Sequence, residues 1–402
     1  MTPPMVDTMF VVLIPTRTPS SFSGFGEQPV GIDLLPADEV GRRVAQLAEV
    51  EVAQFGQSYL ESRRVRRWPL GRARLSAASE GTAPGHADVY LVTHLAGAAL
   101  WEAWIPVGDQ PLDATREIAR LLADTEGGLV AVLREQLAGV DRELSSLPAL
   151  EDAFPFTILR SSAADQSVDA LASAHGADLV RLAYLDRSPF PFKAQVVQDE
   201  LRRDFCLRDG GLQLLSRRGA LDLRVGEEMP RAGEGTLALA PRSSLPLLVT
   251  IELLLMERSV LRLFHERVTT AAPESVQHLL ELKAEVLNGL EEYRGTVAAS
   301  NRFSSEVTNF GKRVLGIDDL YDFLTDRLDA ITFEITTRYQ QTTNVLQFWL
   351  TVVFTALSAS TLAATVAAVR YGQQPMPVAL WAAGVGVMFA SLIALLLRGR
   401  LR

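Results

Sequence analysis

Apolar positions are concentrated in two long stretches near the end of the chain. Between Arg338 and Arg370 there are 31 consecutive uncharged residues. Their most apolar part, Val345 to Val369, rises about 37 Å as an α-helix. A second stretch, Val378 to Leu397, reaches about 30 Å. Since the hydrocarbon core of a bilayer is about 30 Å thick, the pattern predicts two transmembrane helices that form a hairpin.

A third apolar run, Leu245 to Met256, is too short to cross a membrane. It has 12 residues and contains the charged side chain of Glu252, whereas a transmembrane helix needs about 20 predominantly apolar residues. We therefore expect this run to form a buried helix in the part of the protein outside the membrane.

The first 240 residues alternate short apolar runs with helical patterns, which predicts an α+β or α/β domain. The predicted strands are Thr8 to Ile14, Asp88 to His94, Leu100 to Val107, Phe156 to Arg160 and Leu179 to Leu185. The predicted helices are Asp38 to Ser62, Leu112 to Ala123, Gly128 to Leu147, Ser167 to His175 and Val196 to Asp204. Two runs are typical of hairpin turns, Asp209-Gly210-Gly211 between Phe205 to Leu207 and Leu212 to Leu215, and Arg218-Gly219.

Long helical patterns follow the α+β region. They cover Leu245 to Val268, a segment that begins near Pro273 and runs to about Arg302, and Phe303 to Asn344, in which Gly311 and Gly316 are candidates for interruptions. The pattern therefore divides the chain into three parts: an α+β domain (1–242), long stalk helices (243–344), and two transmembrane helices with a short outer loop and a basic tail (345–402).

One face of the last stalk helix is polar, and this face continues into the first transmembrane segment. Four aspartates recur at steps of three, four and three, which places their side chains on one helix face: Asp319, Asp322, Asp326 and Asp329. Towards the membrane the same face carries what we call the polar stripe: Gln340, Asn344, Gln347, Thr351, Thr355, Ser358 and Thr365.

The polar stripe has two explanations. Hydroxyl side chains in membrane helices often pack closely and form hydrogen bonds with their own or a neighbouring helix. Alternatively, several copies of the first transmembrane helix surround a pore, whose hydroxyl and amide oxygens face partly hydrated cations. The aspartates would then raise the local cation concentration. We favour the pore, because Gln347 is costly to expose to lipid and a lumen relieves that cost.

Composition and charge restrict the class of protein. The chain has 402 residues, a formal net charge of -9, one cysteine (Cys206), and 36 arginines against 3 lysines. The negative charge argues against binding of a nucleic-acid polymer, and a single cysteine forms no internal disulfide or zinc ribbon.

The distribution of arginines around the two apolar stretches predicts their orientation. Arg398, Arg400 and Arg402 lie in the tail, whereas the link between the apolar stretches holds only Arg370. The positive-inside rule therefore predicts an integral protein of the bacterial cytoplasmic membrane with both termini in the cytoplasm and with lipid as a partner.

The sequence contains no recognisable catalytic motif. Gly311-Lys312 lacks the upstream glycine of a phosphate-binding loop and the following Ser or Thr. His265-Glu266 begins like a zinc-protease motif, but no histidine stands at position 269. We expect a protein that is not an enzyme and has no resident cofactor.

Short motifs mark both ends of the first transmembrane segment: Leu350-Thr351 near its start, Tyr371-Gly372-Gln373-Gln374 at its end, and Met376-Pro377 shortly after. With the order of the three parts, these motifs resemble the CorA family of divalent-cation transporters. In that family the first span often opens with Leu-Thr and ends in Tyr-Gly-Met-Asn, with Met-Pro shortly after. Two differences stand out: Gln373-Gln374 replaces Met-Asn, and the distance from Leu350 to Tyr371 is longer by about one helical turn.

The resemblance implies a homopentamer whose first transmembrane helices line the pore and whose α/β/α cytoplasmic domains form a funnel. In the family the asparagine of the motif helps to form an outer cation-binding ring, and Gln374 keeps an amide on a longer stem. Mg²⁺ bound between neighbouring cytoplasmic domains would close the pore. The implied function is a channel or transporter for Mg²⁺, Co²⁺, Ni²⁺ or Zn²⁺, with Mg²⁺ or another divalent cation as the transported and regulatory ion. No residue of the sequence identifies the regulatory metal site.

Two other functions are consistent with the sequence. One is a CorA-like membrane effector or sensor, for example in bacterial defence, whose cytoplasmic domain binds a nucleotide signal or a protein partner. The altered Gln373-Gln374 pair keeps this alternative open. The other is a membrane-anchored scaffold that conducts no ions, in which the polar stripe serves only for helix packing.

Overall fold

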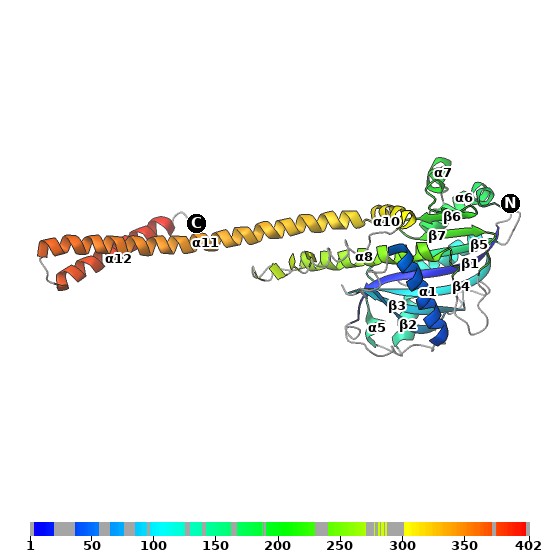
Figure 1. Cartoon of the computed structure of the whole chain (residues 1–402), viewed down its shortest axis with the longest axis horizontal. Coiled ribbons are helices and arrows are strands. Elements are labelled where there is room, and N and C mark those ends of the chain that lie inside the picture. Colours follow the sequence, from blue (N-terminus) through cyan, green and yellow to red (C-terminus); the bar gives the residue numbers. More distant parts are fainter. Residues whose placement is uncertain are drawn as a thin grey trace. The chain divides into compact units, whose positions relative to one another are not determined.

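The fold is described from a computed structural model of the chain. The described residues are 4–19, 37–55, 65–75, 85–94, 97–124, 129–138, 142–161, 167–186, 188, 190–229, 240–270, 277, 280–281, 283–284, 286–287, 301–371 and 375–398. These residues form a mixed α+β protein with an N-terminal sheet and long C-terminal helices (Figure 1).

The described strands form one seven-stranded sheet in the order β2-β3-β4-β1-β5-β7-β6. Neighbouring strands are antiparallel except for β5 and β7, which are parallel. The strands are β1 (Met5–Arg17), β2 (Val65–Arg74), β3 (His86–His94), β4 (Ala98–Pro111), β5 (Phe154–Ser161), β6 (Gly211–Leu215) and β7 (Ala220–Val225). Because β1 lies in the centre, its residues from Phe10 to Ile14 are fully buried.

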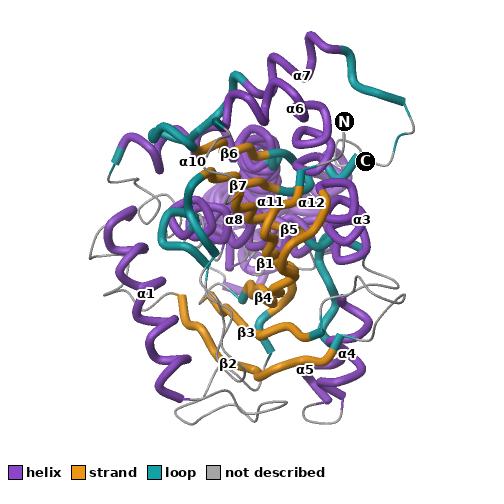
Figure 2. Tube along the Cα trace, turned by 90° about the vertical axis from the view of Figure 1, so that its right-hand side faces the viewer, coloured by secondary structure: helices purple, strands orange, loops and turns teal. Residues whose placement is uncertain are grey.

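Helices cover both faces of the sheet (Figure 2). One face packs against α3 (Leu112–Ala123), α4 (Leu129–Ala138) and α6 (Val168–Tyr184). The other face packs against α8 (Leu245–Thr270), and α8 in turn contacts α1 (Ala37–Phe55) and α10 (Arg302–Val314). Two short helices, α5 (Arg142–Ser146) and α7 (Ala194–Leu201), complete this part of the chain. Since successive side chains of a strand point to opposite faces, both faces of β1 are apolar.

Most predicted elements are found where the hydrophobic pattern places them. The strands predicted from Thr8, Asp88, Leu100 and Phe156 lie within β1, β3, β4 and β5, and the helix Leu112 to Ala123 matches α3. The apolar run that begins at Leu245 is indeed a buried helix, α8.

The predicted strand from Leu179 to Leu185 is wrong, because these residues form the end of α6, which finishes at Tyr184, and its left-handed C-cap, Leu185. Ser167 caps the start of α6 by accepting a hydrogen bond from the backbone N–H of Ala170, and the helix continues through a distorted residue at His175. At Gly176 the Leu201 side chain of α7 lies so close that an added Cβ would be 2.7 Å from Leu201 Cδ1. The apolar residues that follow, such as Leu179 and Leu182, are buried on α6 in the core of the sheet unit.

Two further differences concern turns and edges. Strand β2 was not predicted, because its arginines and Pro69 obscure the alternation of apolar and polar residues. Phe205 to Leu207 forms no strand, so of the two predicted hairpin turns only Arg218-Gly219 joins two strands, β6 and β7. Of the two expected interruptions, Gly311 lies inside α10, whereas Gly316, with φ +69°, separates α10 from α11 (Ile317–Tyr371).

The chain packs as two compact units. The sheet unit comprises Met1–Ala272 and Ala284–Thr325, and the hairpin unit comprises Pro273–Lys283 and Asp326–Arg402. The hairpin unit holds most of α11 and all of α12 (Pro375–Arg398), and both helices contain segments long and apolar enough to cross a membrane.

A buried cluster of charges explains the position of Glu252 inside α8. Arg67 on β2 forms ion pairs with Glu51 of α1 and Glu252, and its Nε lies 3.7 Å from Glu102 Oε2 on β4. Burial opposes the charge of Arg67, whereas the acidic groups around it favour that charge. The four side chains are at most 5% exposed, so the sheet unit holds three carboxyl groups around one cation away from water.

Candidate functional site

The two apolar helices contact each other through small residues. Gly386 of α12 lies against α11 so closely that an added Cβ would be 2.1 Å from Ser360 Oγ and 3.4 Å from the Ala356 carbonyl oxygen. Val352 and Ala367 are buried on the same side of α11. Close approach at small residues is the usual way in which membrane helices pack, so this side of α11 is the one that α12 covers (Figure 1).

The polar stripe lies on a different side of α11. At 3.6 residues per turn, the centre of the stripe is about 140° around the helix from the side that contacts α12. Within the chain six of the seven stripe residues are exposed, and Thr355 is half-buried. Pairing of α11 with α12 therefore leaves the stripe free to face lipid, another copy of the chain or a lumen.

The hydroxyl groups of the stripe are partly satisfied by their own helix. Thr351 Oγ1 donates to the Gln347 carbonyl at 2.8 Å, and Thr365 Oγ1 donates to the Thr361 carbonyl at 2.8 Å. Each hydroxyl proton is used inside the helix, so the oxygen presents only acceptor lone pairs outward. The amides of Asn344 and Gln347 have no side-chain hydrogen bond to any described residue and keep their full polar character at the surface of α11.

All four predicted aspartates lie on the surface of α11. Asp319 and Asp322 belong to the sheet unit and Asp326 and Asp329 to the hairpin unit, and each is exposed. Among the described residues, no group of three or more His, Cys, Asp or Glu side chains is placed to hold a metal ion. Of the outer motif, Tyr371 ends α11, and Gly372, Gln373 and Gln374 lie outside the described residues.

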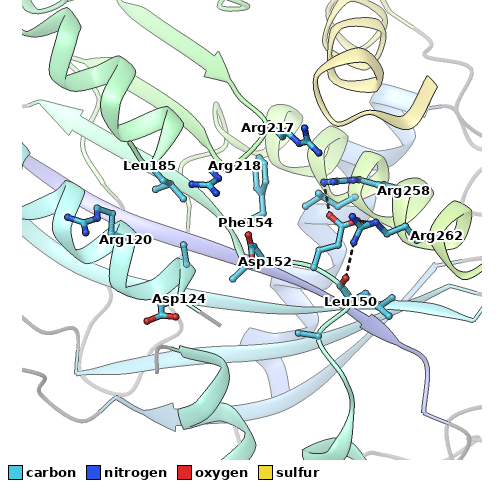
Figure 3. Close-up of a pocket in the computed structure, with 15 residues that line it drawn as sticks. Arg120, Asp124, Leu150, Asp152, Phe154, Leu185, Arg217, Arg218, Arg258 and Arg262 are labelled. Carbon is cyan, nitrogen blue, oxygen red and sulfur yellow. Dashed lines mark hydrogen bonds and ion pairs between the residues drawn. The ribbon is translucent and has the colours of Figure 1, made fainter. Parts of the chain in front are cut away.

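The sheet unit contains a cavity of about 750 Å³ at the end of the sheet where β5 begins (Figure 3). It is bordered by the end of α3, the segment that leads into β5, the turn between β6 and β7, and the middle of α8. Five of its lining residues are arginines: Arg120, Arg217, Arg218, Arg258 and Arg262. Three lining residues are acidic: Asp124, Glu151 and Asp152.

The turn that carries Arg217 and Arg218 is fixed by buried Ser216. The Ser216 hydroxyl accepts hydrogen bonds from the backbone N–H groups of Arg218 and Gly219 and donates one to the Ala183 carbonyl at 2.7 Å. Gly219 fits here because a Cβ would lie 3.0 Å from the Pro155 carbonyl oxygen and 3.1 Å from that of Ala183. A well-anchored turn thus presents two exposed arginines at the cavity.

Arg258 and Arg262 lie one helical turn apart on α8, and both bind Glu151. Their distances to the Glu151 carboxylate are 2.6 Å and 3.0 Å, and Arg262 also donates to the Leu150 carbonyl at 3.0 Å. Burial lowers the pKa of Arg258, an effect that Glu151 opposes and the positive charges of Arg262 and Arg217 strengthen. Arg258 is therefore a largely buried cation that shares one carboxylate with Arg262.

No local sequence pattern predicts this cavity. Its arginines come from three segments that are distant along the chain, and in a composition of 36 arginines and 3 lysines they do not stand out. The pairing of Arg217 and Arg218 in a tight turn is the only local hint, and by sequence alone it indicates a hairpin.

Comparison of the chain with protein-family models, curated proteins and solved structures yields no match.

Proposed function

We propose that the protein is a homo-oligomeric, CorA-like membrane channel for divalent metal cations, in which the polar stripe of α11 lines the pore. The observation that carries the proposal is that α12 packs on another side of α11 and leaves the stripe uncovered. A ring of α11 helices with α12 outside would bury the stripe around a lumen and leave apolar surface for the lipid.

The chemistry of the stripe suits partly hydrated cations. Hydroxyl oxygens whose protons are bound within the helix, such as those of Thr351 and Thr365, offer only acceptors to the lumen. Hard divalent cations prefer oxygen ligands and keep several waters, so neutral oxygens at the distance of a second hydration shell are suitable partners. A lumen also removes the cost of placing Asn344 and Gln347 against lipid.

The family resemblance supplies the remaining parts of the proposal. It implies five subunits, cytoplasmic termini, Mg²⁺ as the transported or regulatory ion, and a funnel formed by the cytoplasmic domains. A sheet covered by helices on both faces is compatible with such a domain. The exposed aspartates of α11 would attract cations on the cytoplasmic side.

The experiment is flux of Mg²⁺, Co²⁺ and Ni²⁺ into liposomes that contain the purified chain and an internal indicator. We expect a saturable signal that is abolished in the double variant Asn344→Leu, Thr351→Leu. The matched control is Thr361→Leu, which removes a hydroxyl about 70° around the helix from the centre of the stripe. Gel filtration in detergent and chemical cross-linking establish that each variant is folded and oligomeric.

Two results would contradict the proposal. Unchanged flux in the double variant would remove the stripe from the ion pathway. Absence of flux from folded, oligomeric wild-type protein, with and without a chelator on the cytoplasmic side, would rule out a cation channel.

A further inference from the structure

The cavity of the sheet unit has an excess of positive charge that the rest of the protein does not explain. Its lining holds five arginines and three acidic residues, which leaves a net charge of 5 − 3 = +2, in a chain whose net charge is -9. Glu151 accounts for Arg258 and Arg262, and Glu117 accounts for Arg120. Arg217 and Arg218 form no ion pair with any described residue, although both lie at the cavity (Figure 3).

We propose that this cavity binds a phosphorylated small molecule of about nucleotide size, whose phosphate groups contact Arg217 and Arg218 together with Arg258 and Arg262. The proposal goes beyond the ion pathway and does not depend on it, because the arginines lie in the sheet unit and the binding can be measured without flux.

Phosphate is the group that fits the arrangement of cations. A guanidinium presents its N–H donors in a planar fork that matches two phosphate oxygens, and such charge-assisted pairs are stronger than neutral hydrogen bonds. Here guanidinium groups approach from two sides, with Arg217 and Arg218 on a turn and Arg258 and Arg262 on α8 (Figure 3). Because Arg258 and Arg262 share the single carboxylate of Glu151, a bound anion would add negative charge beside this pair of cations.

The size and the remaining lining indicate more than a free phosphate ion. A cavity of about 750 Å³ lies within the range of 300–1,000 Å³ that is usual for sites of small organic ligands. Leu150, Leu185 and Leu255 add apolar surface for an organic group. Asp152 repels phosphate but accepts hydrogen bonds from hydroxyl groups, so a sugar hydroxyl suits its side of the cavity.

The test is isothermal titration calorimetry of the full-length protein in detergent, in EDTA-containing buffer of low ionic strength. The ligands are inorganic phosphate, tripolyphosphate, AMP and ATP. We expect saturable binding of at least one polyphosphate compound, weakened at least tenfold in the double variant Arg217→Gln, Arg218→Gln. Both side chains are exposed, so the variant is expected to keep its fold, which its melting temperature checks.

The matched control is the double variant Arg66→Gln, Arg313→Gln, which removes two exposed arginines away from the cavity. Its affinity should equal that of the wild type. Tighter binding of ATP than of tripolyphosphate would support a ligand with an organic group. Equal affinities of ATP and tripolyphosphate would contradict that part of the proposal and leave a site for polyphosphate alone. Equal binding by all three proteins, or no binding of any ligand at millimolar concentration, would overturn the proposal. Neither outcome depends on whether the protein conducts ions.

Discussion

Replacing Glu252 by glutamine tests whether the buried carboxyl group around Arg67 keeps its proton in the folded protein. Burial raises the pKa of Glu252 well above its ordinary value, and the charges of Glu102 and Glu51 add to this effect against the opposing charge of Arg67. The side chain of Glu252 is only 3% exposed, so solvent screens these interactions little. Glutamine keeps the shape and the oxygen acceptor of a protonated glutamate, so we expect Glu252→Gln to be tolerated at neutral pH.

The size of the effect follows from proton linkage. Between the ordinary pKa of about 4.5 and the higher pKa of the folded state, the folded protein binds the Glu252 proton more tightly than the unfolded chain does. The free energy of unfolding of the wild type therefore falls as pH rises through this window, by about 1.4 kcal/mol per pH unit. Glu252→Gln has no such proton, so its stability relative to the wild type should improve by the same amount per unit.

The assay is thermal unfolding of the full chain in detergent between pH 5 and pH 8, followed by the fluorescence of the buried tryptophans of the sheet unit. For a domain of this size, about 1 kcal/mol shifts the midpoint by roughly 2–4 °C. The control is Glu266→Gln, on the same helix but with a half-exposed side chain, for which we expect a change within about 0.5 kcal/mol and no pH trend. As a contrasting variant, Arg67→Met leaves three buried carboxyl groups without their cation and should destabilise by about 3–5 kcal/mol.

A loss of stability of Glu252→Gln relative to the wild type as pH rises would refute the protonation of Glu252 in the folded protein. That result would mean that Glu252 is ionised in the folded protein and that its ion pair with Arg67 prevails over burial. A constant difference at every pH would mean that the pKa of Glu252 is the same in the folded and unfolded states.

Three further predictions concern other parts of the chain. Gly386→Leu should separate α12 from α11, because a side chain at this position would collide with Ser360. We expect the single oligomer peak in gel filtration to be lost or displaced, and an unchanged peak would contradict the contact between the two helices. Ser216→Ala leaves buried N–H and C=O groups of the β6–β7 turn without partners and should cost about 1–3 kcal/mol in thermal unfolding; a change below 0.5 kcal/mol, a surface-like value, would exclude that role. Asp322→Asn with Asp326→Asn should lower cation flux most at low ionic strength, and an equal loss at every salt concentration would argue against electrostatic attraction.

The hydrophobic pattern predicted the elements whose environment is uniform along their length. The apolar runs of α11 and α12 and the doubly buried strands β1, β3 and β4 repeat one pattern over many residues. Prediction failed where tertiary contacts decide between alternatives. Leu179 to Leu185 has the apolar composition of a strand, yet the run continues a helix that is capped at Ser167 and packs against α7 at Gly176. The arginines of β2 are buried because they meet carboxylates from distant elements, which no local pattern encodes.

The same distinction applies to the two candidate sites. The polar stripe was predictable because it lies on a single helix, and its spacing alone assigns its residues to one face. Its exposure, in contrast, depends on the packing of α12, which contacts another side of α11 through Gly386. The arginine-lined cavity needs residues from α3, the segment before β5, the β6–β7 turn and α8, so it exists only in the folded sheet unit.

Helix α8 joins the cavity to the start of α11, which gives the two proposals a physical connection. One side of α8 carries Arg258 and Arg262 at the cavity. Another side contacts α10 through the Glu257–Lys312 ion pair at 2.9 Å and through Leu254, which packs against Gly311. Since only Gly316 separates α10 from α11, a ligand that shifts α8 would act on α10 directly. We therefore expect a ligand that binds the cavity to change the rate of cation flux in liposomes.

The double variant Arg217→Gln, Arg218→Gln separates this coupling from conduction itself. It should conduct at the wild-type rate without ligand, because neither residue lies near the polar stripe in the chain, and should no longer respond to ligand. Intact ligand binding together with an unchanged flux in the wild type would show that the contact between α8 and α10 transmits nothing to the pore. The cavity and the pathway would then be independent functions of the two units, since a ligand shifts an equilibrium only by its difference in affinity for the two states.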